Sequence, residues 1–395
     1  MSFLGYVRPD GSVGIRNYVL VIPGGLISTK ICDFVSGTKT IITADVGSGR
    51  TKKDRETIAR VLIGLGRNPN VAGVIVHDVS HGFGYPELMP ELIASRIDET
   101  GKPVEHISSK DFPDNLQVIQ RGIIVARQMV QDASRARREL VDDSHLSIAV
   151  KCGRSDTTSG LAGNPVLGYL FDKVVAAGGT ALFGETTEVI GAEHILAKRT
   201  VNKEVAAKLL EAVYAIEEQA KNCGEDIRTI NPIPANIAGG ITTLEEKSLG
   251  AIAKAGTQPI QGVLKYGEIP QSKGLYFVDN WMTQLSIFPG YAAAGATLLF
   301  YQMGGSGMLG DTLLSPSPAV ISPLVWTTAN HRAYEAAKES IDFYCGTVIE
   351  GKESIEEAGE RLYALVTDIA SGTLTKTETI NHADPIQMYL QEAPY

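Results

Sequence analysis

The chain has 395 residues, of which 44% are hydrophobic and 21% are charged, and this is enough apolar surface for two hydrophobic cores. Its net charge of -9 is spread along the sequence, which leaves no basic stripe to neutralise a nucleic-acid backbone. Arg8, Asp10 and Arg16 interrupt the region where a signal peptide needs an apolar run, and no window reaches the ~18 apolar residues of a membrane span. We therefore expect a cytoplasmic protein without nucleic-acid or membrane partners.

The first third of the sequence alternates short runs rich in Val and Ile with segments of helical period, as in strands packed between helices. Residues 53–66 space their apolar side chains as an amphipathic helix that closes at Gly66. A long helix is predicted over residues 115–140, and a domain boundary after it delimits an N-terminal α/β domain of residues 1–143. Buried strands are predicted at residues 18–23, 40–44 and 71–76.

The remaining residues, 144–395, are predicted to form a C-terminal catalytic α/β domain with a Rossmann-like arrangement. Its first strand runs into a polar turn and then a helix, and a second strand and turn repeat that order, so both turns are expected to face one crevice at the carboxyl ends of parallel strands. Strands are predicted at residues 146–151, 181–184, 274–279 and 296–301. Helices are predicted at residues 165–177, 191–199, 203–219, 244–255, 331–338 and 355–370.

The first turn, CGRSDTTSG (residues 152–160), places a thiol, a guanidinium, a carboxylate and four hydroxyls directly after a hydrophobic strand. One interpretation is that Arg154, the hydroxyls and backbone N–H groups bind a polyhydroxy or carboxylate ligand, with Asp156 as base or metal ligand. The other is a turn and helix N-cap in which Ser and Thr satisfy free amides. The pattern itself leaves both open. The four cysteines of the chain lack CxxC spacing, so Cys152 is expected to act singly.

The second turn lies in GETTEVIGAEH and contains Glu185, Glu188, Glu193 and His194. Carboxylate oxygens and an imidazole suit a divalent metal such as Fe²⁺ or Mn²⁺, and a carboxylate at a strand end also suits a general base. A helical histidine is, however, more often a surface residue than a ligand.

Three other segments attract attention on weaker grounds. His77 and His81 resemble a metal-binding pair, but a loop follows the first, and a structural role is favoured. The loop at residues 303–311 is neither a Walker loop nor a Rossmann fingerprint, which argues against nucleotide binding, although its amides suit a carboxylate. Thr243 and Glu246 read as a capping box, which leaves Asn236 and Lys247 as candidate ligands of substrate oxygens.

Taken in order, several long motifs resemble the altronate and galactarate dehydratase family across nearly the whole chain. They are GYVRPDGSVGIRN, NPNVAGVIV, KCGRSDTTSG followed by NPVLG, VVAAGGTALFGETTEVIGAEHIL, NIAGGITTLEEKSLGAIAKAG and CGTVIEG. The resemblance implies a divalent metal and removal of water from a sugar acid to give a 2-keto-3-deoxy acid. It also implies a homo-oligomer and a small partner subunit with an antifreeze-like domain, because this chain begins directly at GYVRPDG. A branch similar in KCG-SDTTSG and FGET, the sulfolactate sulfo-lyase large subunit, expels sulfite instead.

In both branches a base removes the C2 proton beside a carboxylate, and cations or a metal stabilise the resulting enediolate. By this resemblance we expect three sets of site residues. The catalytic set is Asp156, Glu185 and Lys247. The substrate-binding set is Arg154, Ser155, Thr157, Thr158, Asn236 and Ser306. The metal ligands, for Fe²⁺ or Mn²⁺, are Cys152, Glu188 and His194.

The sequence also departs from the dehydratase pattern. Family cysteines expected after the first three strands are replaced by PGGLIST, ADVGSGR and HDVSHG, and SPSPAVISPLVWTTAN has no counterpart of a family lysine. Dehydration of a sugar acid is the favoured function, carbon–sulfur cleavage of 3-sulfolactate to pyruvate and sulfite is the alternative, and a non-catalytic binding subunit is the third hypothesis. A site filled by bulky apolar side chains would favour the third.

Overall fold

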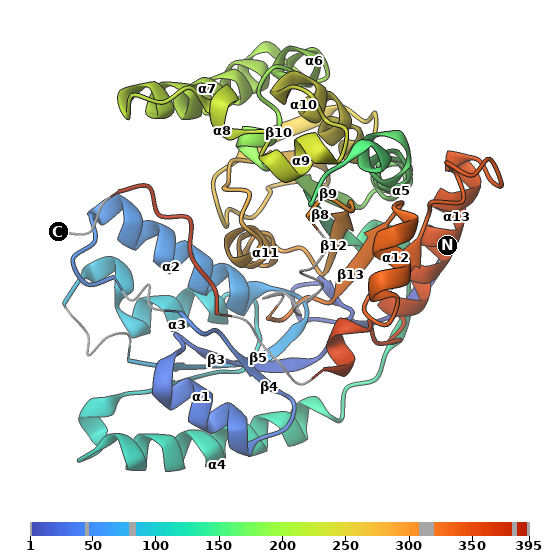
Figure 1. The fold of residues 1–395 in the computed structure, drawn as a ribbon. Coiled ribbons are helices and arrows are strands. Elements are labelled where there is room, and N and C mark those ends of the chain that lie inside the picture. The colour runs from blue at the N-terminus through green and yellow to red at the C-terminus, as the bar shows by residue number, and fades with distance from the viewer. Residues whose placement is uncertain (1, 44–46, 79–83, 308–319, 381–384, 393–395) are drawn as a thin grey trace.

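The computed structural model describes residues 2–43, 47–78, 84–307, 320–380 and 385–392 (Figure 1). Within these residues the strands form a seven-stranded, a four-stranded and a three-stranded sheet. The seven-stranded sheet comes from the C-terminal part of the chain and the four-stranded sheet from the N-terminal part. Helices are interspersed with the strands of both parts, so the predicted α/β class with mostly parallel sheets is confirmed.

The large sheet has the strand order β10-β11-β9-β8-β12-β13-β14, and its described pairings are parallel. Because β8 is central, residues at its carboxyl end have strand neighbours on both sides. Its strands are β8 (Ser147–Gly153), β9 (Thr180–Phe183), β10 (Ile260–Leu264), β11 (Gly274–Val278), β12 (Leu298–Met303), β13 (Leu324–Thr328) and β14 (Phe343–Tyr344). The predicted strands are found within a few residues of their expected bounds.

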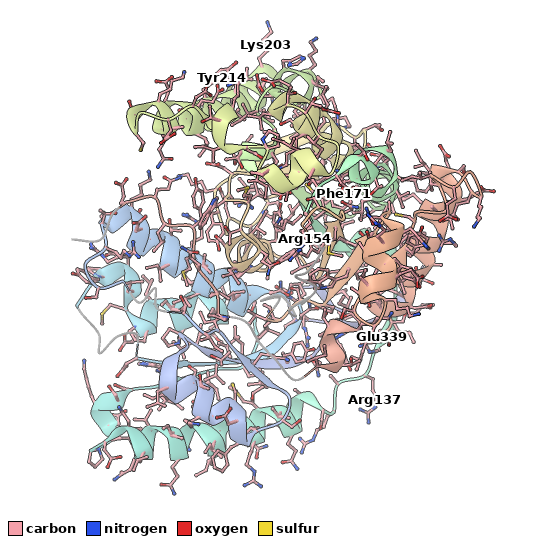
Figure 2. All side chains as sticks on the ribbon, viewed as in Figure 1. Arg137, Arg154, Phe171, Lys203, Tyr214 and Glu339 are labelled. Carbon is pink, nitrogen blue, oxygen red and sulfur yellow. The ribbon has the colours of Figure 1, made fainter. Side chains whose placement is uncertain are left out.

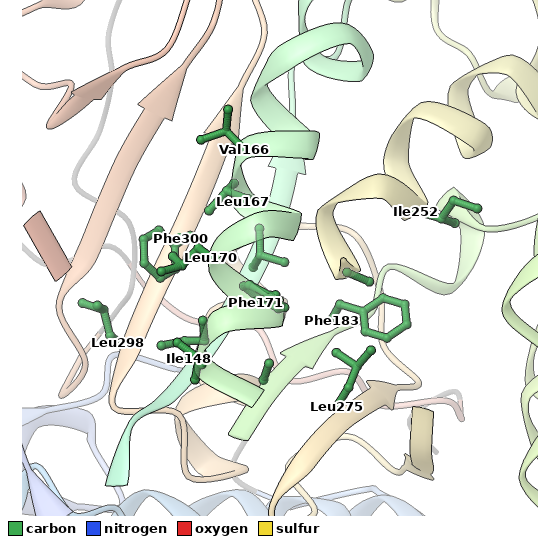
Figure 3. Packing of buried hydrophobic residues seen from close by; sticks show 14 of the residues in the cluster. Ile148, Val166, Leu167, Leu170, Phe171, Phe183, Ile252, Leu275, Leu298 and Phe300 are labelled. Atoms are coloured by element: carbon green, nitrogen blue, oxygen red, sulfur yellow. The ribbon is translucent and has the colours of Figure 1, made fainter. Parts of the chain in front are cut away.

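Alternate residues of β8 face opposite layers of helices, as expected of a strand buried on both faces. Ile148 and Val150 belong to the core under α5 and α13, part of which Figure 3 shows with Leu170 and Phe300, whereas Ala149 belongs to the core under α11. No described helix is both long and apolar enough to cross a bilayer. The helices are α5 (Asn164–Ala176), α6 (Glu193–Lys198), α7 (Lys203–Asn222), α8 (Ile227–Ile230), α9 (Pro234–Ala238), α10 (Leu244–Ile252), α11 (Gln284–Ala293), α12 (His331–Ala337) and α13 (Ile355–Ala370).

The small parallel sheet has the order β4-β3-β5-β6 and lies in the lower part of Figure 1 between two pairs of helices. Leu62 and Ile93 place α2 and α3 in one core, and Ile31 and Val118 place α1 and α4 in another. The strands are β3 (Tyr18–Ile22), β4 (Thr38–Thr40), β5 (Val71–His77) and β6 (Val104–Ile107). The helices are α1 (Gly25–Phe34), α2 (Lys52–Arg67), α3 (Pro90–Asp98) and α4 (Asn115–Ala133).

Two predicted elements differ from the structure. The helix expected over residues 115–140 ends at Ala133, and β7 (Glu139–Asp142) pairs with β1 (Ser2–Val7), whose other neighbour is β2 (Val13–Gly14). Arg138 explains the change, because its guanidinium donates hydrogen bonds to the carbonyls of Leu4, Ile15 and Ala370 and so fixes the chain in a tertiary position. The strand expected at residues 40–44 ends at Thr40, and residue 44 lies outside the described residues.

Two buried asparagines join the N-terminal part to the C-terminal part. Asn68 donates to the carbonyls of Ala292 (2.8 Å) and Ala296 (2.9 Å) beside α11. Asn70 is fully buried and donates to the carbonyls of Thr297 (2.8 Å) and Ile321 (3.0 Å). Its Oδ1 also accepts from the backbone N–H groups of Ile15 (2.8 Å) and Arg16 (3.1 Å). Each amide therefore satisfies backbone groups that packing removes from water.

Replacement of Asn70 by Ala is expected to lower the free energy of unfolding by about 2–4 kcal/mol, because it leaves several buried backbone groups without partners. Chemical and thermal unfolding followed by circular dichroism measure the change. Asn222→Ala, at the exposed last position of α7, is the matched control and is expected to be near neutral. An Asn70→Ala variant as stable as the control would contradict the role of this residue as the joint.

Candidate functional site

Polar side chains gather where the central strands β8, β9, β11, β12 and β13 end. The parallel register places Val150 beside Phe183 and Cys152 beside Gln302, so the turns after β8 and β9 are neighbours. The backbone N–H of Cys152 donates to Glu185 Oε2 over 3.0 Å, which links the two turns directly. The turns predicted from CGRSDTTSG and GETTE therefore meet at one edge of the sheet.

Glu185 lies at the centre of a buried cluster of charges. Its carboxylate is paired with the Lys254 ammonium at Oε2, and Lys151 Nζ lies 3.4 Å from Oε1. Lys254 Nζ is also 3.1 Å from the sulfur of Cys152. The side chains of Glu185, Lys254 and Lys151 are 0%, 1% and 8% exposed, so water screens these charges only weakly.

The charges in this cluster stabilise one another. Burial alone would raise the pKa of Glu185, but the ammonium groups of Lys254 and Lys151 hold it below its ordinary value. Burial opposes protonation of both lysines, yet the negative charge of Glu185 helps to keep their pKa values above the ordinary value. Burial raises the pKa of the Cys152 thiol to about 11. At neutral pH the cluster therefore contains two ammonium groups, one carboxylate and a neutral thiol.

A second ion pair lies beside the first. Lys247 Nζ donates to Glu188 Oε1 (3.1 Å), Asn231 Oδ1 (2.7 Å) and Asn236 Oδ1 (3.3 Å), so each of its three N–H bonds has an acceptor. Asn236 Nδ2 in turn donates to the carbonyl of Ser155 (2.9 Å) and to Ser306 Oγ (3.1 Å). Asn236 therefore ties α9 to the segments after β8 and β12.

Asp156 has both carboxylate oxygens engaged. Oδ1 accepts from the N–H (2.9 Å) and hydroxyl (2.6 Å) of Thr158 and from the N–H of Ser159 (3.2 Å). Oδ2 accepts from the N–H of Gly305 and from Asn330 Nδ2, both over 2.7 Å. The carboxylate thus caps the turn that leads into α5 and joins it to the loops after β12 and β13. The turn was interpreted from the sequence either as a ligand site or as a helix N-cap. Asp156 caps backbone amides and also lies in the candidate site, so the two interpretations are compatible.

The other predicted substrate-binding residues lie around the same turn. Arg154 has a positive φ of 48°, unusual for a residue other than glycine, and is partly exposed at the end of β8 near the centre of the view in Figure 2. Ser155 and Ser306 are buried, whereas Thr157 is exposed. A cavity of about 370 Å³ lies between this turn and α10, with Ser155, Asp156 and Lys247 in its wall. That volume falls in the range of small-molecule sites.

The structure does not gather the predicted metal ligands. His194 is exposed on α6, whereas Cys152 is buried beside Lys254 and Glu188 is paired with Lys247. Among the described residues, no three His, Cys, Asp or Glu side chains are grouped for a metal ion. An ammonium group occupies the position beside each buried candidate ligand that a cation would take. The predicted trio of Cys152, Glu188 and His194 therefore does not fit a divalent metal.

The weaker sequence signals lie elsewhere or outside the described residues. His77 is buried at the end of β5, where its Nε2 is 2.7 Å from Ser28 Oγ, and burial lowers its pKa to about 4, which fits the favoured structural role. His81 and residues 308–311 of the glycine loop lie outside the described residues, as do residues 44–46 and 315–319 of the departing segments. Thr243 does cap α10 by accepting from the N–H of Glu246, but the Glu246 carboxylate accepts from Thr242 instead of Thr243.

Sequence reasoning missed several residues of this site, among them Lys151, Lys254, Asn280 and Asn330. A signal existed for the two lysines, because Lys151 ends an apolar strand and Lys254 stands alone in the apolar segment GAIAKAG. A lysine in such a run is rarely buried without a charged partner. The asparagines follow β11 and β13 without any distinguishing pattern.

Comparison with known proteins matches most of the chain. The family description "D-galactarate/Altronate dehydratase, C-terminal" fits residues 143–392, and "D-galactarate dehydratase/Altronate hydrolase, second domain" fits residues 5–134. The (2R)-sulfolactate sulfo-lyase subunit beta of Chromohalobacter salexigens is 34% identical over 99% of this chain and 98% of its own length. The altronate dehydratase of Bacillus subtilis is 30% identical over 95% of this chain and 75% of its own. The galactarate dehydratase (L-threo-forming) of Escherichia coli is 30% identical over 94% and 73%.

These relatives are lyases by name, and two family descriptions together span residues 5–392 except for the short stretch between them. The resemblance stated from the sequence motifs is therefore confirmed. The chain belongs to the D-galactarate/altronate dehydratase family.

Proposed function

We propose that this chain is the catalytic subunit of a lyase that removes a proton from C2 and a leaving group from C3 of a 2-hydroxy acid. The observation that carries the proposal is an excess of positive charge at the strand ends. Among the described residues, the ammonium groups of Lys151, Lys247 and Lys254 are in ion-pair contact with two carboxylates, those of Glu185 and Glu188. Arg154 and the Asp156 carboxylate add one charge of each sign, so four cations and three carboxylates leave one positive charge, which favours an anionic ligand.

The chemistry requires such a charge. When a base takes the C2 proton, the electrons of the C–H bond pass into the adjacent carboxylate, which becomes a doubly negative enediolate. The C2–C3 double bond then forms as the bond from C3 to its leaving group breaks, and the enol product becomes a 2-keto acid. Positive charge fixed in a dry site lowers the energy of the enediolate without reorganisation.

Side chains of this chain account for binding and orientation. We assign Arg154 to the substrate carboxylate, since it is partly exposed beside the cavity, and Lys247, whose three donors are engaged, to the positive charge of the cavity wall. Asp156 also lines the cavity, whereas Glu185 is fully buried, which supports Asp156 for contact with substrate and Glu185 for holding the lysines. Polar side chains dominate the strand ends, and this supports a catalytic subunit over a non-catalytic one.

Water is the leaving group we propose first, so that the substrate is a sugar acid and the product a 2-keto-3-deoxy acid. The two dehydratase relatives and the hydroxyls of Ser155, Thr157 and Ser159 in the cavity wall support this choice. The second candidate is cleavage of 3-sulfolactate to pyruvate and sulfite. Its support is the sulfo-lyase subunit beta, which matches this chain over 98% of its own length. The word "subunit" in that name also supports a companion subunit here.

The proposed function is tested by product formation on a panel of aldonates, aldarates and 3-sulfolactate. The purified chain is assayed anaerobically, with and without a companion subunit and with and without added Fe²⁺ or Mn²⁺. A 2-keto-3-deoxy acid is expected from a sugar acid, because elimination across C2–C3 yields that product. Sulfite with pyruvate would establish the second candidate, and the absence of any product under every condition would contradict a lyase function.

Lys254→Met is expected to lower kcat/KM about 100-fold, because it removes the excess positive charge beneath the site. The double variant Lys254→Met with Glu185→Gln restores one excess charge and is expected to recover part of the loss. Lys352→Met, on an exposed side chain, is the matched control. Circular dichroism verifies that each variant is folded. A folded Lys254→Met variant with the activity of the control would refute the role of the buried charge.

A further inference from the structure

Glu185 has a left-handed backbone conformation, with φ 67° and ψ 69°. L-residues other than Gly and Asn adopt this conformation at a cost, so neighbouring groups must hold it. In this conformation the side chain turns back toward the strand ends, where its carboxylate meets Cys152 N and Lys254 Nζ. The direction of the carboxylate therefore depends on how the turn after β9 is held.

Asn280, directly beyond β11, is the side chain that contacts this turn. Its Oδ1 accepts a hydrogen bond from the backbone N–H of Glu185 over 2.8 Å, and Asn280 is only 1% exposed. The neighbouring Gly184 leaves room for this contact, because a Cβ atom there would lie 2.5 Å from Asn280 Oδ1. The close approach of the two loops requires glycine at that position.

Backbone and side-chain hydrogen bonds fix Asn280 in turn. The N–H of Thr186 donates to the carbonyl of Asn280, and the N–H of Asn280 donates to Thr186 Oγ1, each over 3.2 Å. Thr186 Oγ1 donates to Asp279 Oδ1 over 2.7 Å. The loops after β9 and β11 are thus joined by reciprocal bonds, and the amide oxygen of Asn280 is aimed at Glu185.

We propose that Asn280 is a positioning residue, which holds Glu185 in the left-handed conformation so that its carboxylate keeps Lys254, Lys151 and Cys152 in place beneath the site. The role in catalysis rests on the proposed lyase function. The structural part does not, because the contact between Glu185 and Cys152 is measurable without any substrate. Asn280 acts through Glu185 and does not itself touch the reacting atoms.

The reactivity of the Cys152 thiol reports on this arrangement. In the native protein Cys152 is buried, its N–H is bonded to Glu185 and its raised pKa keeps the thiol neutral at pH 8, so iodoacetamide reacts slowly. Loss of the Asn280 contact frees the turn and opens the cluster more often. Cys345 is also buried but lies at the end of β14, and it serves as the internal reference in the same molecule.

The experiment compares Asn280→Ala, Asn280→Asp and the surface control Asn222→Ala in the full chain, with alkylation of each cysteine followed by peptide mass spectrometry. Asn280→Ala is expected to increase the Cys152 rate about tenfold while Cys345 is unchanged, because the left-handed turn loses its support. Asn280→Asp keeps an acceptor oxygen and is expected to remain close to the wild type. If the alanine variant does not fold, Asn280→Ser, too short to reach the Glu185 N–H, takes its place.

Kinetics complete the test on a substrate that the wild type converts. Asn280→Ala is expected to lower kcat about 100-fold with KM changed less than about threefold, whereas Asn222→Ala is expected to leave both unchanged. A Cys152 rate equal to that of the wild type in Asn280→Ala, or equally raised in Asn280→Asp, would overturn the proposal. A raised Cys152 rate in a protein without activity on any substrate would support the positioning role and count against the lyase function instead.

Discussion

The site depends on one interaction, the burial of the Glu185 carboxylate between two ammonium groups. The three charges come from different parts of the chain: Lys151 from the end of β8, Glu185 from the turn after β9 and Lys254 from the short helical turn after α10. Removal of Glu185 would leave two ammonium groups buried without compensation, and an unpaired buried charge is far more costly than a lost surface ion pair. The cluster therefore fixes the relative positions of the two central strands and the helix above them.

Around this cluster, neutral amides also join neighbouring segments. Asn236 connects the loops after β8 and β12, and Asn330 connects Asp156 to the end of β13. Asn68 and Asn70 perform the same task between the two parts of the chain. An amide offers both donors and acceptors without introducing charge. It can therefore bond to several buried backbone N–H and C=O groups that lack a partner in a helix or sheet.

The sequence predicted the elements well where the physics is local. The apolar spacing of residues 53–66 and the Val- and Ile-rich runs correspond to α2, β5 and β8, since helix and strand periodicity survive in the sequence. Residues 134–140 were wrongly predicted as helix because Arg138 and strand β1 determine the conformation there, and both contacts span more than a hundred residues. The two turn motifs were predicted to face one another, and they do meet at one edge of the sheet. Asn280 gave no signal, because its contact with Glu185 arises only where two loops meet.

The same limit applies to the metal prediction. Cys152, Glu188 and His194 are residue types that bind metals, and their proximity in sequence motifs made a shared ligand set plausible. Residue type does not reveal where a side chain points. His194 is exposed on α6, Cys152 lies beside Lys254, which was not predicted, and Glu188 is paired with Lys247. Lone lysines in apolar segments, such as GAIAKAG, deserve the same weight as histidines when a buried carboxylate is predicted nearby.

The connection between β9 and β10 contains many of the charged and amide residues of the candidate site. It runs from Gly184 to Pro259, forms α6 through α10 and supplies Glu185, Glu188, Asn236, Lys247 and Lys254, while the sheet contributes Lys151 and Cys152. Because β10 is the edge strand of the sheet, this long connection returns to the sheet at its edge and does not separate the inner strands. A lineage can thus exchange or remodel one continuous stretch of sequence and obtain a different ligand preference on an unaltered scaffold. Such modularity offers a structural route by which a single fold comes to serve both dehydration and desulfonation.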